Sequence, residues 1–172
     1  MFTIKTILKL IILMLPLEMF ASPIHITSDA MEIQTLSTNM QMRFYHNACV
    51  DGDEFSLSAN HIQIAIVNGA RQVSSTLNLS VIEEIHATGN ATFEQASYAG
   101  RANKISIYPA KKLIVLEGNA EIENEKSGII YGQTLILDLE NKKIRSESSE
   151  FERSTISIND ISKFKSNNIL IK

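Results

Sequence analysis

The side chains that most often carry out chemistry are few in this chain, and their spacing fits neither a catalytic nor a metal site. The four histidines, His25, His46, His61 and His86, lie far apart, and neither His-x-x-x-His nor Cys-x-x-Cys occurs. No Gly-x-Ser-x-Gly turn, which marks the serine nucleophile of many hydrolases, is present. We therefore expect no catalytic residue, no metal site and no cofactor.

Two further patterns could carry chemistry. The carboxylates Glu121, Glu123 and Glu125 recur at every second position, so side-chain alternation along a strand puts all three on one outward face. A solvated face is the ordinary explanation, and a calcium or acid–base site is the alternative. No predicted helix follows Gly89-Asn90 or Gly118-Asn119 to hold a phosphate at its N-terminus, and we interpret these pairs as turns at the start of strands.

Charge and cysteine content exclude other classes of protein. The chain carries 16 Lys and Arg against 19 Asp and Glu, and because these charges are interspersed we expect no nucleic-acid partner. Cys49 is the only cysteine, which excludes an internal disulfide. Alternation places Cys49 opposite Ala48 and Val50, and we interpret it as incidental and not as a reactive thiol.

A short block that occurs three times organises the chain. Its copies are residues 47–50 (Asn-Ala-Cys-Val), 90–93 (Asn-Ala-Thr-Phe) and 119–122 (Asn-Ala-Glu-Ile), and a polar turn and a second alternating apolar run follow each copy. Stacked units of this kind bury their apolar faces only against their neighbours. The runs are short, rich in β-branched residues and bounded by turn signals, which predicts an all-β fold. Residues 70–81 interrupt the repeat as a loop or a loosely held strand.

The phase of the apolar residues predicts a corner in the sheet. Leu57 is in phase with the apolar residues before Ala59-Asn60, but Ile62 continues in the opposite phase after it. A bend or bulge at Ala59-Asn60 keeps both halves facing inward, and Ala102-Asn103 occupies the same place in the next copy. Two apolar faces folded together form a sandwich or jelly roll, whose interior could be filled or left open as a groove. By alternation, the interior is lined by Ala48, Val50, Ile62, Ile64, Ile105, Ile122, Leu135 and Leu137.

The two ends of the chain stand apart from this domain. Lys5 and Lys9, the apolar residues 7–17 and the small residue Ala21 form a secretory signal peptide, with cleavage expected near Ala21. Retention of residues 1–21 as a membrane anchor is the alternative. We expect one β domain over residues 22–158, and residues 159–172 form a C-terminal tail or edge extension.

Several motifs together are typical of one known family. They are residues 23–29 (Pro-Ile-His-Ile-Thr-Ser-Asp), the repeated Gly-Asn-Ala, residues 58–60 (Ser-Ala-Asn) and residues 115–120 (Val-Leu-Glu-Gly-Asn-Ala). In this order and spacing, from Pro23 to about Ile158, the chain resembles the periplasmic lipopolysaccharide transport proteins of the LptA (OstA-like) type. It departs from that pattern at His46, where the family usually has Gly, and over residues 70–81.

The resemblance implies a twisted, V-shaped antiparallel jelly roll that is open at both ends. Its interior groove would hold the acyl chains of lipopolysaccharide and leave the sugars outside. Ile24, Ile26, Phe93 and Ile107 match groove positions of that family and also lie on apolar faces by alternation. The protein would then be periplasmic, and it would pass lipopolysaccharide from an inner-membrane export complex to an outer-membrane translocon.

The resemblance also implies docking through the terminal edge strands, which are residues 24–27 and 153–158 here. Through these strands the chain would bind both membrane complexes and would dock head to tail with further copies of itself. Alternatively, residues 159–172 fold back and cap the last edge. Two other functions stay open. One is a membrane-anchored sister component of the same inner-membrane complex, and the other is a self-assembling β scaffold with a filled core and no lipid.

Overall fold

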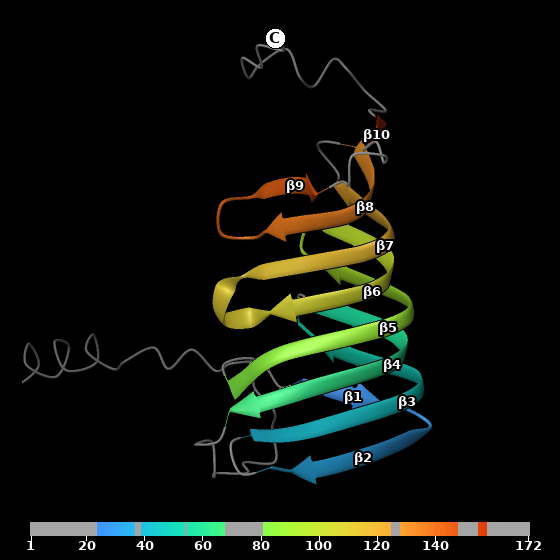
Figure 1. Ribbon diagram of the computed structural model, residues 1–172, viewed down its shortest axis with the longest axis vertical. Coiled ribbons are helices and arrows are strands. Elements are labelled where there is room, and N and C mark those ends of the chain that lie inside the picture. The colour runs from blue at the N-terminus through green and yellow to red at the C-terminus, as the bar shows by residue number, and fades with distance from the viewer. Residues whose placement is uncertain are drawn as a thin grey trace, which may run out of the picture.

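One antiparallel β-sheet makes up the described part of the protein. The computed structural model describes residues 24–36, 39–53, 55–67, 81–124, 128–147 and 155–157, which contain ten strands. The sheet order is β1-β3-β4-β5-β6-β7-β8-β10, while β2 also pairs with β3 and β9 also pairs with β8. The strands stack along the long axis of the molecule, with β2 at one end and β9 and β10 at the other (Figure 1). The all-β prediction is confirmed.

The strands and their connections have the following bounds. They are β1 (His25–Thr27), β2 (Ala30–Thr35), β3 (Asn39–Gly52), β4 (Phe55–Val67), β5 (Ile82–Gln95), β6 (Tyr98–Tyr108), β7 (Leu113–Asn124), β8 (Gly128–Asp138), β9 (Lys143–Glu147) and β10 (Thr155–Ser157). A single 3-10 turn, η2 (Pro109–Lys111), connects β6 to β7. Proline fits this turn because its ring fixes φ and it lacks an N–H that a strand would need.

Each long strand turns a corner in its middle. In β5 the corner lies at Gly89-Asn90, where φ is +80° and +51°, and in β7 it lies at Gly118-Asn119, where φ is +77° and +51°. The pairing with the next strand shifts register at both places, as it does at His46-Asn47 in β3. The interpretation of Gly89-Asn90 and Gly118-Asn119 as turns at the start of strands is therefore wrong. The expectation that these positions need a permissive backbone is correct, but each strand begins several residues before its Gly-Asn pair.

The partner strands β4 and β6 bend at the positions where the phase change predicted a corner. Pairing of β4 with β5 shifts between Ser58 and His61, and pairing of β6 with β7 shifts between Arg101 and Lys104, so the predicted corner is confirmed. The side chains of Asn60 and Asn103 fill the space that a Cβ on Gly89 or Gly118 would need. A Cβ built on Gly118 would lie 2.7 Å from Nδ2 of Asn103.

The corners divide the sheet into two layers that face each other, as the ribbons curving back at one side show (Figure 1). The first layer consists of β2, residues 39–45, 61–67, 82–88, 104–108, 113–117 and 134–138, and β9. The second layer consists of β1, residues 48–52, 55–58, 91–95, 98–101, 120–124 and 128–132, and β10. This is the jelly roll that the motifs implied.

Small residues line the inside of the corner. Ala48 pairs with Ala59, Ala91 with Ala102, and Ala120 with Gly132, and all five alanines are buried. The two layers meet there and the alanines are already almost fully buried, so little room remains for a larger side chain. This geometry explains why an alanine follows the asparagine in every copy of the repeated block.

Both edges of the sheet are split at the same corner. At one edge β1 and β2 pair with the two halves of β3, and at the other β10 and β9 pair with the two halves of β8. The strand β2 was not predicted, and of the predicted last strand only residues 155–157 are described. The predictions for residues 1–21, 70–80 and 159–172 lie outside the described residues. Among the described residues, no helix is long and apolar enough to cross a membrane.

Candidate functional site between the two layers

The interior between the layers holds every residue that the sequence assigned to a groove. Eleven of the twelve are buried, and Ile26 is half-buried and packs against them. The first layer contributes Ile62, Ile64, Ile105, Ile107, Leu135 and Leu137, and the second contributes Ile24, Ile26, Ala48, Val50, Phe93 and Ile122. They belong to one continuous apolar cluster that runs from β1 to β8. Whether a ligand touches them stays a prediction.

Sequence reasoning missed about half of this interior. Met42, Phe44, Ile85, Ala87, Ile114 and Leu116 are buried in the same cluster. They lie in the halves of β3, β5 and β7 before the corner, and they keep the same alternation as the repeated block after it. Extending the alternation of the repeated block backwards through the corner, without a phase change, would have found them.

The two layers touch each other across the interior. Phe93 of the second layer and Leu116 of the first both border the space beside Gly100, where an added Cβ would meet them. Both side chains are essentially excluded from solvent. In this structure protein side chains therefore fill the middle of the interior, and an acyl chain could enter it only if the layers part.

An opening remains between the layers on the side away from the corner. It is a cavity of about 300 Å³ between Phe55 and Gln95 of the second layer and Ile107, Leu113 and Leu139 of the first. Ligand pockets usually measure about 300–1,000 Å³, so this volume suits one small apolar group and not a multi-acylated lipid. The opening lies between strand ends, which are easier to move apart than the strand centres because fewer buried contacts hold them.

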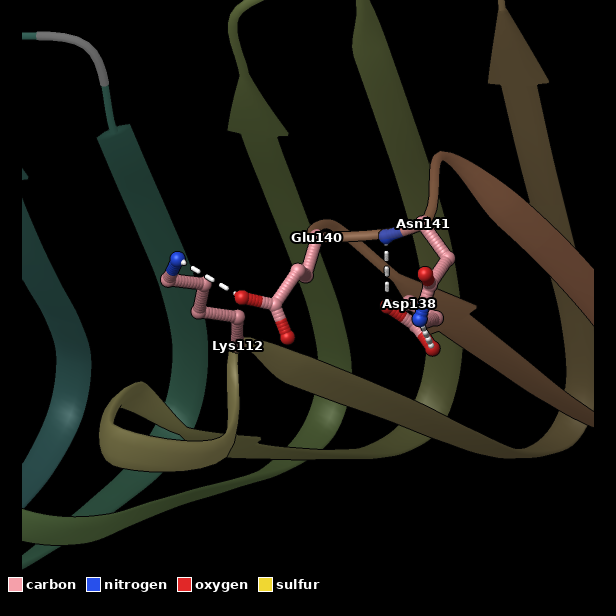
Figure 2. Close-up of polar contacts among 4 residues, drawn as sticks. All are labelled: Lys112, Asp138, Glu140 and Asn141. Carbon is pink, nitrogen blue, oxygen red and sulfur yellow. Dashed lines mark hydrogen bonds and ion pairs between the residues drawn. The ribbon is translucent and has the colours of Figure 1, made fainter.

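Polar contacts join the two turns at the rim of this opening (Figure 2). The ammonium of Lys112 lies 3.2 Å from a carboxylate oxygen of Glu140, and the backbone N–H of Leu139 donates to the carbonyl of Lys112. Asp138 accepts hydrogen bonds from the side-chain and backbone N–H groups of Asn141, which lower the pKa of its carboxyl group below the ordinary value. Both ion-pair partners are exposed, so their pairing adds little to the stability of the closed rim.

The interior face is open to solvent at the β2 end. Met31 and Ile33 pair in register with the buried Phe44 and Met42, so their side chains lie on the inward face. They are nevertheless 60% and 53% exposed, because no further strand covers them among the described residues. The apolar surface therefore continues to the end of the sheet.

Comparison with known proteins connects this architecture to a family. Residues 24–143 match the family model described as the LptA/(LptD N-terminal domain) LPS transport protein. This match extends over more than half of the chain. The chain belongs to this LPS transport family.

A solved structure shares the fold of this LptA/LptD-family chain. It is the crystal structure of LptH, the LptA homologous periplasmic component of the conserved lipopolysaccharide transport device from Pseudomonas aeruginosa. The TM-score is 0.62 at 13% identity, and the match covers 78% of this chain and 95% of LptH. A search of curated proteins gives no match.

The LptA/LptD family is a family of transport proteins and not of enzymes. Within the described ranges, no three His, Cys, Asp or Glu side chains come close enough to hold a metal. Glu121 of the acidic series is paired with Arg101, at 2.6 Å, and Glu123 faces solvent. Cys49 is half-buried on the outer face, where burial and the neighbouring Asp51 raise the pKa of its thiol. A raised pKa reduces the thiolate fraction, so the group is a poor nucleophile at neutral pH.

Proposed function

We propose that this protein is a periplasmic carrier that shields the acyl chains of lipopolysaccharide between its two layers. The observation that carries the proposal is the unbroken apolar cluster, which runs from β1 to β8 and borders the side opening, and whose apolar face continues to solvent through Met31 and Ile33 of β2. Family membership and the shared fold support it. The expected signal peptide, cleaved near Ala21, would deliver the chain to the periplasm.

Apolar shielding supplies the thermodynamic reason for such a carrier. Each methylene group that leaves water gains about 0.8 kcal/mol, so a lipid with several acyl chains cannot cross an aqueous compartment unprotected. Because Ile, Leu and Val line the interior from strand to strand, successive positions offer nearly the same environment. Movement along the interior then needs no chemistry in this protein, and the driving energy comes from elsewhere in the transport system.

The layers must part for cargo to enter, and the side opening is where this costs least. At the opening the lining side chains come from strand ends and turns, whereas Phe93 and Leu116 sit in the packed middle. An acyl chain that enters replaces the contacts which the two layers lose with each other. The interior would thus open progressively from Phe55 and Ile107 inward.

The edges of the sheet are the proposed docking sites. Among the described strands, β1 and β2 pair only with β3 and β9 and β10 pair only with β8, so a partner strand could be added at either edge. We propose that one edge meets the inner-membrane export complex, the other meets the outer-membrane translocon, and copies of the chain dock head to tail between them. Exposed Met31 and Ile33 would be covered by such a contact.

Photo-crosslinking tests the proposal directly. A photoreactive residue at position 107, in the opening, or at position 93, in the middle, should crosslink to lipopolysaccharide in cells. Position 104 is the matched control, because Lys104 lies on the same strand β6 but on the outer face, paired with Glu117 at 2.7 Å. Ile107→Asp should weaken lipid binding, measured at a temperature where circular dichroism shows that the variant is folded, because Ile107 is buried. Equal crosslinking at 104 and 107 would contradict an interior site.

A scaffold without a lipid ligand is the second candidate function, and the packed interior favours it. It predicts no crosslink from any interior position and self-association that lipid leaves unchanged. The membrane-anchored sister component predicts instead that the mature protein keeps residues 1–21, which mass spectrometry of the purified protein would reveal.

A further inference from the structure

A second concave surface lies on the outer side of the corner, away from the apolar interior. It is a groove of about 760 Å³ that crosses β5, β6, β7 and β8. Its size is within the usual range of ligand pockets, about 300–1,000 Å³. The proposed lipid function makes no use of it.

Side-chain amides form a ladder along this groove. Each of the four strands contributes one, namely Asn90, Asn103, Asn119 and Gln133, and all four residues are exposed. Neighbouring strands lie about 4.8 Å apart, so the amides repeat at that spacing. Each amide offers both hydrogen-bond donors and an acceptor.

The backbone explains only part of the ladder. Asn90 and Asn119 adopt positive φ, which asparagine tolerates better than most residues. Gln133 has no positive φ, and Tyr131 is 38% exposed on the outer face beside it. Positive φ therefore does not account for either of these two residues.

The charges in the groove are balanced. Arg101 and Glu121 line it, and they form an ion pair with N–O distances of 2.6 and 2.7 Å. A phosphate or a carboxylate would have to compete with Glu121 for the guanidinium. The groove therefore suits a neutral, hydroxyl-rich ligand.

We propose that the outer corner groove binds an oligosaccharide chain. Sugar hydroxyls donate and accept hydrogen bonds, as the amide ladder requires, and the C–H face of a pyranose ring packs on an aromatic ring such as Tyr131. The strand spacing is close to the length that one pyranose residue adds to a glycan, so successive sugars meet successive strands. The sugar could come from free cell-wall glycan or from the saccharide part of lipopolysaccharide, and this site does not depend on an acyl chain in the interior.

Titrations with two lipid-free probes test the groove and separate these sources. One probe is a tetramer of N-acetylglucosamine, and the other is the oligosaccharide released from lipopolysaccharide by mild acid. We expect saturable binding of at least one, with NMR shifts at residues of β5 to β8 near the corner. Gln133→Ala and Tyr131→Ala should each weaken binding about fivefold, the effect of one lost hydrogen bond or ring contact.

Gln63→Ala is the matched control, since Gln63 is an outward amide on β4 that does not line the groove. It should leave binding unchanged. Absence of saturable binding by both probes, or equal affinity of the Gln133→Ala, Tyr131→Ala and unaltered proteins, would overturn the proposal. Because neither probe carries an acyl chain, failure here would leave the lipid function untouched, and failure of crosslinking at position 107 would leave the groove untouched.

Discussion

A cross-link that ties the two layers together across the side opening should prevent acyl chains from binding. Gln95 of the second layer and Leu113 of the first line the same cavity and are both half-buried, so cysteines at these positions can be bridged by a short, cleavable bis-maleimide. Cys49→Ser removes the native thiol first. The cross-link leaves the interior side chains unchanged and blocks only the separation of the layers.

The expected magnitude follows from the surface that moves. An acyl chain of about a dozen methylenes gains about 10 kcal/mol on leaving water. Uncovering Phe55, Ile107 and Leu113 costs at most about 9 kcal/mol, at about 1.5–3 kcal/mol for each side chain, before the acyl chain covers them again. The free-energy cost of separating the layers is therefore offset only when an acyl chain enters between them. In a bridged protein the layers cannot separate, so an acyl chain cannot replace their contacts. We therefore expect its affinity for lipopolysaccharide to fall at least about 100-fold, or about 2.7 kcal/mol.

Fluorescent lipopolysaccharide displacement measures this affinity before bridging, after bridging and after cleavage of the linker. The double-cysteine protein treated with a monofunctional maleimide controls for modification alone. A bridge between Lys104→Cys and Glu117→Cys, which are neighbours on the outer face of the first layer, controls for the linker. Unchanged affinity of the Gln95–Leu113 bridged protein would refute the idea that the layers must part.

Three further predictions concern the corner and the rim. Gly118→Ala should lower the free energy of unfolding by about 2 kcal/mol or more, because a Cβ at positive φ is strained and would also enter the space of a neighbouring amide; urea denaturation measures this. His46→Gly should raise the free energy of unfolding by about 0.5–1 kcal/mol, because φ is +59° at this non-glycine residue. Asp138→Asn should destabilise the protein at neutral pH but not at low pH. Hydrogen bonds from Asn141 lower the pKa of Asp138 below 3.8, so the stabilisation is present above the unfolded-state pKa and is lost as pH falls through the folded-state value.

A control or a contradicting outcome tests each of these three predictions. Gly52→Ala should change stability by less than about 0.5 kcal/mol, because Gly52 has no positive φ and a Cβ there has ordinary contacts; a similar loss in both alanine variants would contradict the corner argument. A less stable His46→Gly protein would show that the imidazole makes a contact that outweighs its backbone strain. For Asp138→Asn, a stability difference that persists at a pH below the lowered folded-state pKa of Asp138 would exclude the carboxylate as its cause.

Alternation and phase were sufficient to predict the all-β class, the corner and half of the interior. They work because burial on one face enforces a period of two, so that residues such as Val50 and Ile122 are recognisable in a single strand. The phase change between Leu57 and Ile62 is equally local. It identified the corner because only a bulge can keep both residues inside.

Other features depend on contacts that no local pattern contains. The Gly118-Asn119 pair reads as an ordinary turn, and only pairing with β8 on both sides shows that the strand continues through it. Strand β2 alternates Met31 and Ile33 with polar residues, but its weak burial comes from its position at the edge of the sheet. The approach of Phe93 and Leu116 to the same space beside Gly100 depends on how the layers sit relative to each other, which sequence does not specify.

The split edges make the corner relevant to docking as well as to folding. A partner sheet that continues this one must match two half-strands at once, β1 and β2 at one end or β10 and β9 at the other. At the edge formed by β1 and β2, the corner includes the connection between these two strands. The backbone N–H of Asp29 donates to the carbonyl of His46, and the side-chain amide of Asn47 donates to the Asp29 carboxylate at 3.0 Å. A partner displaced by one residue would bring its corner out of line and turn its apolar face outward. Continuity of the apolar interior across a junction would therefore require that the corners align, which would give the proposed end-to-end docking a single register.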